Sequence, residues 1–149
     1  RGIFFATYTA SSLLIRLLAN KSSDKHGRII VLIFSSLALA ISMMFLSFVH
    51  TPVMFLISAA IFGLSWGMNG PTLTAWTVDL CAPENRGRAV ASMYIALEAG
   101  IGIGAFISAK IYDNKSSNFI YAFITPAILA LVSAMLLFIW RRKKIQAAK

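Results

Sequence analysis

The segment Asn20-Lys21-Ser22-Ser23-Asp24-Lys25-His26-Gly27-Arg28 separates two long apolar runs, Gly2–Ala19 and Ile29–Val49. Aspartate, glycine and several cations are therefore concentrated between two segments of nearly membrane-spanning length. The composition agrees with this, because 58% of the chain is hydrophobic and only 13% is charged, whereas soluble domains carry about 25% charged residues. We therefore expect lipid to surround most of this chain.

Five apolar segments meet or approach the length of about 20 residues that a transmembrane helix needs. They cover approximately 2–18, 29–49, 52–78, 89–112 and 119–140, and residues 141–149 form a basic tail. The sequence predicts an all-α membrane protein, a bundle of five transmembrane helices in a lipid bilayer. Because the connections are short, we expect sequential helices to be antiparallel neighbours.

The cations indicate an orientation. Alternating connections place ten Lys and Arg residues on one side and three on the other. The larger set is Lys21, Lys25, Arg28, Arg86, Arg88, Arg141, Arg142, Lys143, Lys144 and Lys149; the smaller is Arg1, Lys110 and Lys115. The positive-inside rule predicts that the larger set and the C-terminus are cytoplasmic. We interpret the tail as a topology anchor, with contact to anionic lipid as the alternative.

The formal charge of +9 and pI near 10.2 do not indicate a nucleic-acid partner, because the cations lie in short connections and form no basic face. The single cysteine, Cys81, predicts no metal cluster, and His26 and His50 both lie in connections. We expect no cofactor and no metal. No HExxH motif, Ser/His/Asp set or pair of intramembrane acids indicates an enzyme.

Glu98 lies near the middle of the fourth span. A carboxylate at that depth costs roughly 2.5–3.5 kcal/mol, so we expect it to face a cavity or a partner and not lipid. Intramembrane acids are usually functional, which makes Glu98 a candidate for carrying a proton or binding a cation. The structural alternative is a neutral carboxyl group that is hydrogen-bonded to a neighbouring helix.

The third span contains Pro71, which cannot donate a hydrogen bond to the carbonyl of Gly67 and should bend the helix. Trp66 and Asn69 lie beside this expected bend, and a polar and aromatic cluster at membrane depth suits a substrate path. We take Trp66 and Asn69 as candidate substrate contacts. The structural alternatives are that Trp76 anchors the membrane interface and that the nearby threonines bond back to their own helix.

Gly100 and Gly104 belong to a row of small residues in the fourth span. Ala96, Gly100, Gly104 and Ser108 recur every four residues and would form one helix face. Small faces allow close approach of transmembrane helices, so we interpret these glycines as packing residues. They are not a dinucleotide loop, because no strand precedes them.

These patterns, in this order, resemble the major facilitator superfamily of transporters. Asp24-Lys25-His26-Gly27-Arg28 is similar to the family loop between helices eight and nine, although Asn20 stands where the family favours glycine. The run 79–89 is similar to the loop between helices ten and eleven. Glu98 with the glycines after it resembles a pattern in helix eleven of some bacterial efflux permeases.

The resemblance implies that the five spans are helices eight to twelve of a twelve-helix fold, with the N-terminal half and the seventh helix outside this chain. It implies that Asp24, Gly27, Arg28, Asp79 and Arg86 are gating residues. Solute and protons would then bind between two halves that rock in the bacterial cytoplasmic (inner) membrane.

Two functions remain open at this point. The first is export of a small organic solute by alternating access, coupled to protons, in the complete transporter. The second is a small membrane scaffold or assembly subunit that carries no solute. The substrate and the direction of transport do not follow from the sequence.

Overall fold

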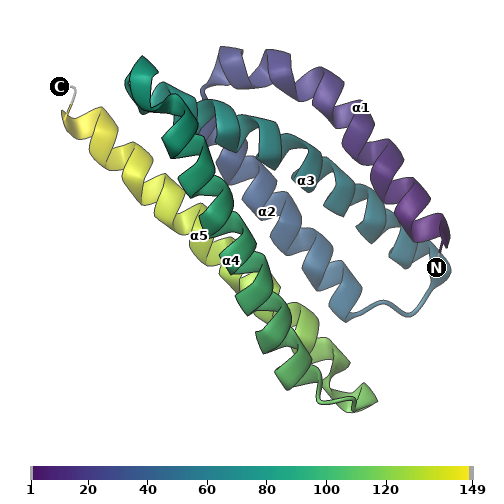
Figure 1. Cartoon of the computed structure of the whole chain (residues 1–149). Coiled ribbons are helices and arrows are strands. Elements are labelled where there is room, and N and C mark those ends of the chain that lie inside the picture. The colour runs from purple at the N-terminus through teal and green to yellow at the C-terminus, as the bar shows by residue number, and fades with distance from the viewer. Residues whose placement is uncertain (1, 148–149) are drawn as a thin grey trace.

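The structure is a computed structural model that describes the backbone of residues 2–147, and their side chains except at 18–26, 116, 144, 145 and 147. Within this part of the chain all regular structure is helical. The helices are α1 (Gly2–His26), α2 (Arg28–Ser47), α3 (Pro52–Asp79), α4 (Arg86–Tyr112) and α5 (Phe119–Ala147), with one-turn 3-10 helices at Pro83–Asn85 and Ser116–Asn118 (Figure 1). The expected all-α fold is confirmed.

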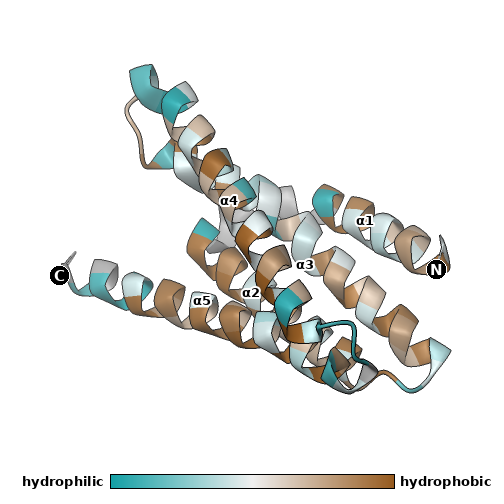
Figure 2. Ribbon diagram, turned by 60° about the horizontal axis from the view of Figure 1, so that its bottom comes forward, coloured by the Kyte–Doolittle hydropathy of each residue, from teal (hydrophilic) through white to brown (hydrophobic). Residues whose placement is uncertain are grey.

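The helices have the length and composition of membrane spans. Four segments are long and apolar enough to cross a bilayer, at Arg28–Ser47, Pro52–Asp79, Pro83–Tyr112 and Phe119–Lys143, and α1 contributes a shorter apolar part, Gly2–Leu17. Large apolar side chains point outward, including Leu17 (76% exposed) and Ile95 (71% exposed). Hydrophobic residues extend along the helices, and hydrophilic residues gather mainly at helix ends and connections (Figure 2). The protein is an integral, multi-pass membrane protein.

The connection between the first two helices is much shorter than the sequence predicts. The polar segment expected as a loop is helical up to His26, and Gly27 alone separates α1 from α2. Gly27 has a φ of 89°, in the region that favours glycine, and its carbonyl accepts from the N–H of Ile30 at 3.2 Å. Polar composition marks where a helix leaves the lipid, but it does not end the helix. The long loop was therefore a wrong prediction.

The connections at the other end of the bundle, between α2 and α3 and between α4 and α5, have ordinary capping features. Thr51 caps α3, because its Oγ1 accepts from the N–H of Met54 at 3.2 Å and Pro52 follows it. Asp113, with a φ of 44°, ends α4 in a left-handed conformation.

α5 does not end at Trp140 but continues to Ala147, so most of the basic tail is helical.

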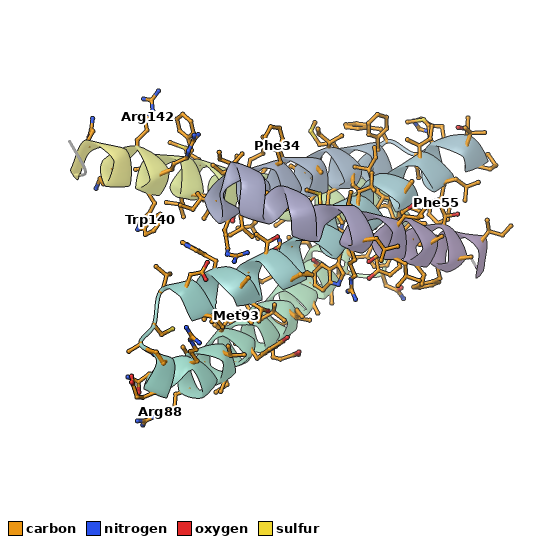
Figure 3. The ribbon with its side chains drawn as sticks, turned by 90° about the horizontal axis from the view of Figure 1, so that it is seen from above. Phe34, Phe55, Arg88, Met93, Trp140 and Arg142 are labelled. Carbon is orange, nitrogen blue, oxygen red and sulfur yellow. The ribbon has the colours of Figure 1, made fainter. Side chains whose placement is uncertain are left out.

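α2 lies at the centre of the tightly packed part of the bundle. It packs against α3 on one side and α5 on the other, and α1 packs along α3. α4 makes only limited contact with α5 and α3. Figure 3 shows the start of α4, marked by Arg88, diverging from the end of α5, marked by Trp140.

The interface of α2 and α3 is built around buried serines. The Oγ of Ser42 donates to the carbonyl of Ser58 at 2.8 Å, and the Oγ of Ser65 donates to the carbonyl of Ser35 at 2.7 Å. All four serines are fully buried. Because lipid tails are as apolar as leucine, small residues and such hydrogen bonds are what hold transmembrane helices together.

The interface of α1 and α3 depends on two glycines of α3. A Cβ added at Gly67 would lie 2.6 Å from the carbonyl oxygen of Ser12, and one added at Gly63 would lie 2.9 Å from the Cβ of Ser11. Any side chain at either position would push the helices apart. The two backbones approach closely only because α3 has no side chains there.

Gly100 and Gly104, in contrast, have open space beside them. A Cβ added at either position meets nothing within 4 Å among the described residues. The packing role predicted for them therefore has no partner in this part of the chain and stays a prediction.

Candidate functional site

An ion pair joins the first residue of α2 to the last residue of α3. The Nε of Arg28 donates to the Oδ2 of Asp79, with 27% and 51% of the two side chains exposed. Gly27 positions Arg28 for this contact by turning the chain directly before it. Among the described residues Asp79 pairs with Arg28 and not with Arg86, although Arg86 is much nearer to it in the sequence.

The remaining members of the predicted gating loop are placed as follows. Asp24 belongs to the last turns of α1, and its side chain lies outside the described residues. Arg86 is exposed at the start of α4. The structure thus brings Gly27, Arg28 and Asp79 together, and among the described residues Arg86 takes no part in this ion pair.

A row of aromatic rings follows the seam between α1 and α3. The rings of Tyr8 and Phe62 lie 5.4 Å apart, and Phe62 stacks on Trp66 at 6.3 Å with an interplanar angle of 14°. Phe4 and Phe55 form a further pair at 4.6 Å, nearer the other end of the seam. Trp66 remains 39% exposed, so the aromatic row presents an open face.

Two adjoining cavities open at the end of the bundle away from Arg28 and Asp79. The smaller, about 380 Å³, is lined by Phe4, Phe5, Met43, Leu46, Phe55, Phe62 and Phe123. The larger, about 710 Å³, is lined by Met43, Phe62, Ile101, Ala105, Ser108, Ala109, Tyr112, Phe119, Ala122, Phe123 and Pro126. No charged side chain lines either of them. These walls suit apolar groups and not ions.

Glu98 is exposed on α4 and lies one turn before Ile101. It belongs to the same helix face as Ile101, Ala105, Ser108 and Tyr112, which line the larger cavity. At 1.5 Å per residue, Glu98 lies roughly 18 Å along α4 from Arg86, and Trp66 lies roughly 20 Å along α3 from Asp79. Both candidate residues therefore lie near the middle of their helices.

Asn69 is half-buried on α3, and the helix continues through Pro71 without a break. The hydroxyl of Thr74 donates to the carbonyl of Gly70 at 3.0 Å, and that of Thr77 donates to the carbonyl of Leu73 at 2.9 Å. These threonines bond back to their own helix, which is the structural alternative stated above. Their hydroxyl groups therefore have partners within α3.

Two tryptophans link α3 to α5 near the end that carries Asp79. The rings of Trp76 and Trp140 meet edge to face, with centroids 5.3 Å apart. Trp140 and Arg142 leave α5 on opposite sides (Figure 3). The guanidinium group of Arg142 lies 4.7 Å from the centre of the Phe138 ring. Trp76 thus has a helix-packing partner in addition to its predicted place at the interface.

The aromatic row and the cavities were missed from the sequence, although a signal was present. Phe55 and Phe62 are seven residues apart, and Phe62 and Trp66 are four apart, which places all three on one face of α3. This spacing predicts one aromatic face. The partners on α1 and α5 follow only from the tertiary packing.

These features define a class before any comparison is made. Long apolar helices, serine and glycine interfaces and a carboxylate in the middle of an apolar helix are features of a multi-pass α-helical membrane protein. The chain belongs to the Major Facilitator Superfamily, whose family model matches residues 2–149. This places it in a family of transporters and not of enzymes.

Two curated relatives are similar over most of the chain. A "Tetracycline resistance protein, class H" of Pasteurella multocida is 28% identical over 135 residues, covering 90% of this chain and 34% of the relative. A "Multidrug resistance protein 1" of Bacillus subtilis (strain 168) is 27% identical over 137 residues, covering 89% and 35%. The chain therefore spans about a third of the length of the curated relatives it matches.

Proposed function

We propose that this chain is part of a permease that exports a small, apolar, aromatic organic solute by alternating access, in exchange for protons. Family membership supports transport, and the two resistance proteins support export. Because the chain spans about a third of these relatives, the transporting unit includes further helices, among them a second half that faces these five.

The observation that carries the solute class is the aromatic row Tyr8–Phe62–Trp66. It lies at mid-membrane, is partly exposed, and offers ring faces at 5.4 and 6.3 Å spacing. An aromatic solute gains apolar burial there, and stacking adds about 0.5–1.5 kcal/mol per ring pair. Asn69, one turn further along α3 from Trp66, supplies the polar group that orients the solute.

Glu98 is the proton carrier in this proposal. Of the five acidic residues in the sequence, it alone lies inside an apolar span; Asp24, Asp79, Glu84 and Asp113 lie in connections or at helix ends. A carboxyl group within the apolar part of a span needs a water-filled cavity or a partner, so Glu98 can take up or release a proton only when the transporter exposes it to water. That property couples proton release to the exposure of the site.

Arg28 and Asp79 form the latch of the transport cycle. Their pair fixes the start of α2 to the end of α3, at the end of the bundle where the charge distribution predicts cytoplasm. An exposed ion pair contributes only about 0–1 kcal/mol, so it can open and close during transport without unfolding the bundle. Asp24 and Arg86 join this latch in the state in which the transporter opens to the side opposite the cytoplasm. The C-terminus lies in the cytoplasm, and the membrane is the bacterial inner membrane.

The test is efflux from proteoliposomes that contain the complete transporter, with tetracycline and an aromatic dye as probes. Trp66→Ala and Phe62→Ala should raise the KM for the probe at least several-fold, while Trp66→Phe should retain most of the affinity. Trp76→Ala is the matched control, because Trp76 packs against Trp140 outside the aromatic row. A KM that is unchanged in Trp66→Ala would remove the aromatic row from the solute path.

A further inference from the structure

The C-terminal end of α5 carries positive charge that no acidic residue of its own helix balances. Residues 119–149 contain five cations and no Asp or Glu, and α2, the helix packed most closely against α5, contains no acidic residue either. Arg142 and Lys143 are exposed. Asp79, at the same end of the bundle, pairs with Arg28, and among the described residues no carboxylate pairs with Arg142. This end of α5 therefore suits an anionic ligand.

Arg142 is held on the outer surface of α5 by an aromatic ring. Its guanidinium group lies 4.7 Å from the centre of the Phe138 ring, one turn earlier on the same helix face. Helical side chains tilt toward the N-terminus of their helix, so Arg142 points back along α5 and not past its end. The ring contact leaves N–H donors available, and the planar fork of a guanidinium group matches the oxygens of a phosphate.

An exposed apolar stripe continues from Arg142 toward the middle of α5. Phe138, Met135 and Leu131 form this α5 stripe, since all three are exposed and they recur at helical spacing; Met135 is 64% exposed. At 1.5 Å per residue, Leu131 lies roughly 17 Å along α5 from Arg142. The hydrocarbon core of a bilayer is about 30 Å thick, so the stripe extends over about the depth of one leaflet.

α2 adds a second apolar surface beside the stripe. Phe34 of α2 is 63% exposed, and in Figure 3 it lies on the same side of the molecule as Arg142, whereas Trp140 points to the other side. The buried residues of α5 are small, which lets the backbones of α2 and α5 approach each other and leaves the large apolar side chains outside the contact. These small residues are Ala127, Ala130 and Ala134.

We propose that the outer face of α2 and α5 binds an anionic phospholipid of the surrounding membrane. Arg142 binds the phosphate, with Lys143 beside it, and an acyl chain lies along the α5 stripe toward Phe34. The cations favour this lipid over a zwitterionic one, and the apolar stripe favours it over free phosphate. The proposal requires that the helices span a membrane, and it depends neither on export nor on proton coupling.

Site-specific photo-crosslinking in the complete transporter tests this. p-Benzoylphenylalanine is introduced at Met135 in the α5 stripe or at Ile103, an exposed residue of α4 that serves as the matched control position. The protein is irradiated in vesicles of equal parts phosphatidylglycerol and phosphatidylcholine with the same acyl chains, and the linked lipids are identified by mass spectrometry. At Met135 we expect about fivefold more links to phosphatidylglycerol, the factor that one cation contributes near an anionic headgroup. At Ile103 we expect equal links to both lipids.

Substitutions identify the cation that is responsible. Arg142→Ala should bring the ratio at Met135 close to one, whereas Arg142→Lys, which keeps the charge, should retain at least half of the enrichment and so separates loss of charge from loss of folding. Arg88→Ala is the matched control, because Arg88 is an exposed cation on the part of α4 that diverges from the end of α5 (Figure 3). It should leave the ratio unchanged.

Four results would overturn the proposal: equal links to both lipids at Met135, an enrichment that Arg142→Ala does not lower, an equal loss in Arg88→Ala, or links from Met135 to a second copy of the chain. Displacement of the linked lipid by inorganic phosphate would also overturn it, because the cations would then form a site for free phosphate. Links are read without transport, so a transporter that exports nothing but gives the expected links would refute the proposed function and not this lipid site.

Discussion

The bundle has two kinds of helix surface, and the contrast between α3 and α4 shows how lipid changes the rules of packing. α3 packs closely against α1 and α2 through its glycines and serines. α4 carries as many small residues, but none of its residues is buried. The same residue types therefore make a closed interface in one place and an open surface in another. Small residues in a transmembrane helix permit an interface, but only a partner helix completes it.

The largest expected effect comes from filling the closed interface. Gly67→Ala places a methyl group against the backbone of Ser12, so we expect a loss of about 1–3 kcal/mol in the free energy of unfolding. The measurement is unfolding of the complete transporter in mixed micelles of increasing SDS content. Gly102→Ala on α4 is the control, since it meets nothing within 4 Å and lines neither of the two adjoining cavities. Equal effects of the two substitutions would contradict the contrast between α3 and α4.

The next effect concerns the serine hydrogen bonds between α2 and α3. Ser42→Ala and Ser65→Ala each remove a hydroxyl donor that reaches across the interface. Interhelical hydrogen bonds in membranes contribute about 0.6 kcal/mol on average, so we expect a loss of that order for each substitution. Ser92→Ala is the matched control, because the Ser92 hydroxyl only bonds back to the carbonyl of Arg88 on α4. A larger loss in Ser92→Ala than in Ser65→Ala would show that these hydrogen bonds do not hold α2 to α3.

The smallest effect on stability is expected at the ion pair. A double-mutant cycle with Arg28→Ala and Asp79→Ala should give a coupling of about 0–1 kcal/mol, which decreases with added salt. The same substitutions should lower the transport rate much more than the stability, because the pair acts in switching between states. A transport rate that falls only as far as the stability does would show that the pair is structural.

The sequence predicted the kind of fold but not its register. The lengths of the apolar segments were enough to locate the helices. Thr51 followed by Pro52 is a sequence pattern typical of a helix start, and α3 begins there. The predicted end of α1 was wrong, because the polar residues after the apolar segment continue the helix as far as His26, and Gly27 ends it. A single sequence also does not show which helix a small face will meet. For this reason Gly100 and Gly104 stood out, while the contacts of Gly63 and Gly67 with α1 did not.

The candidate site was predicted in part for the same physical reason. Glu98 and Trp66 were visible because a carboxylate and an indole are unusual at mid-membrane. The pairing of Arg28 with Asp79 was missed, since it joins residues 51 positions apart whose helices must first be placed. Tyr8 carried no signal of its own. It belongs to the site only because α1 packs beside Phe62.

The measurement that tests the central claim most directly is proton-driven transport by the Glu98→Gln variant of the complete transporter. Proteoliposomes are given an imposed pH gradient and, separately, equal pH with solute on both sides to follow counterflow. We predict that Glu98→Gln retains counterflow, because the solute face on Trp66 and Phe62 is intact, and loses accumulation against a gradient. Accumulation equal to that of the unmodified transporter would contradict the account.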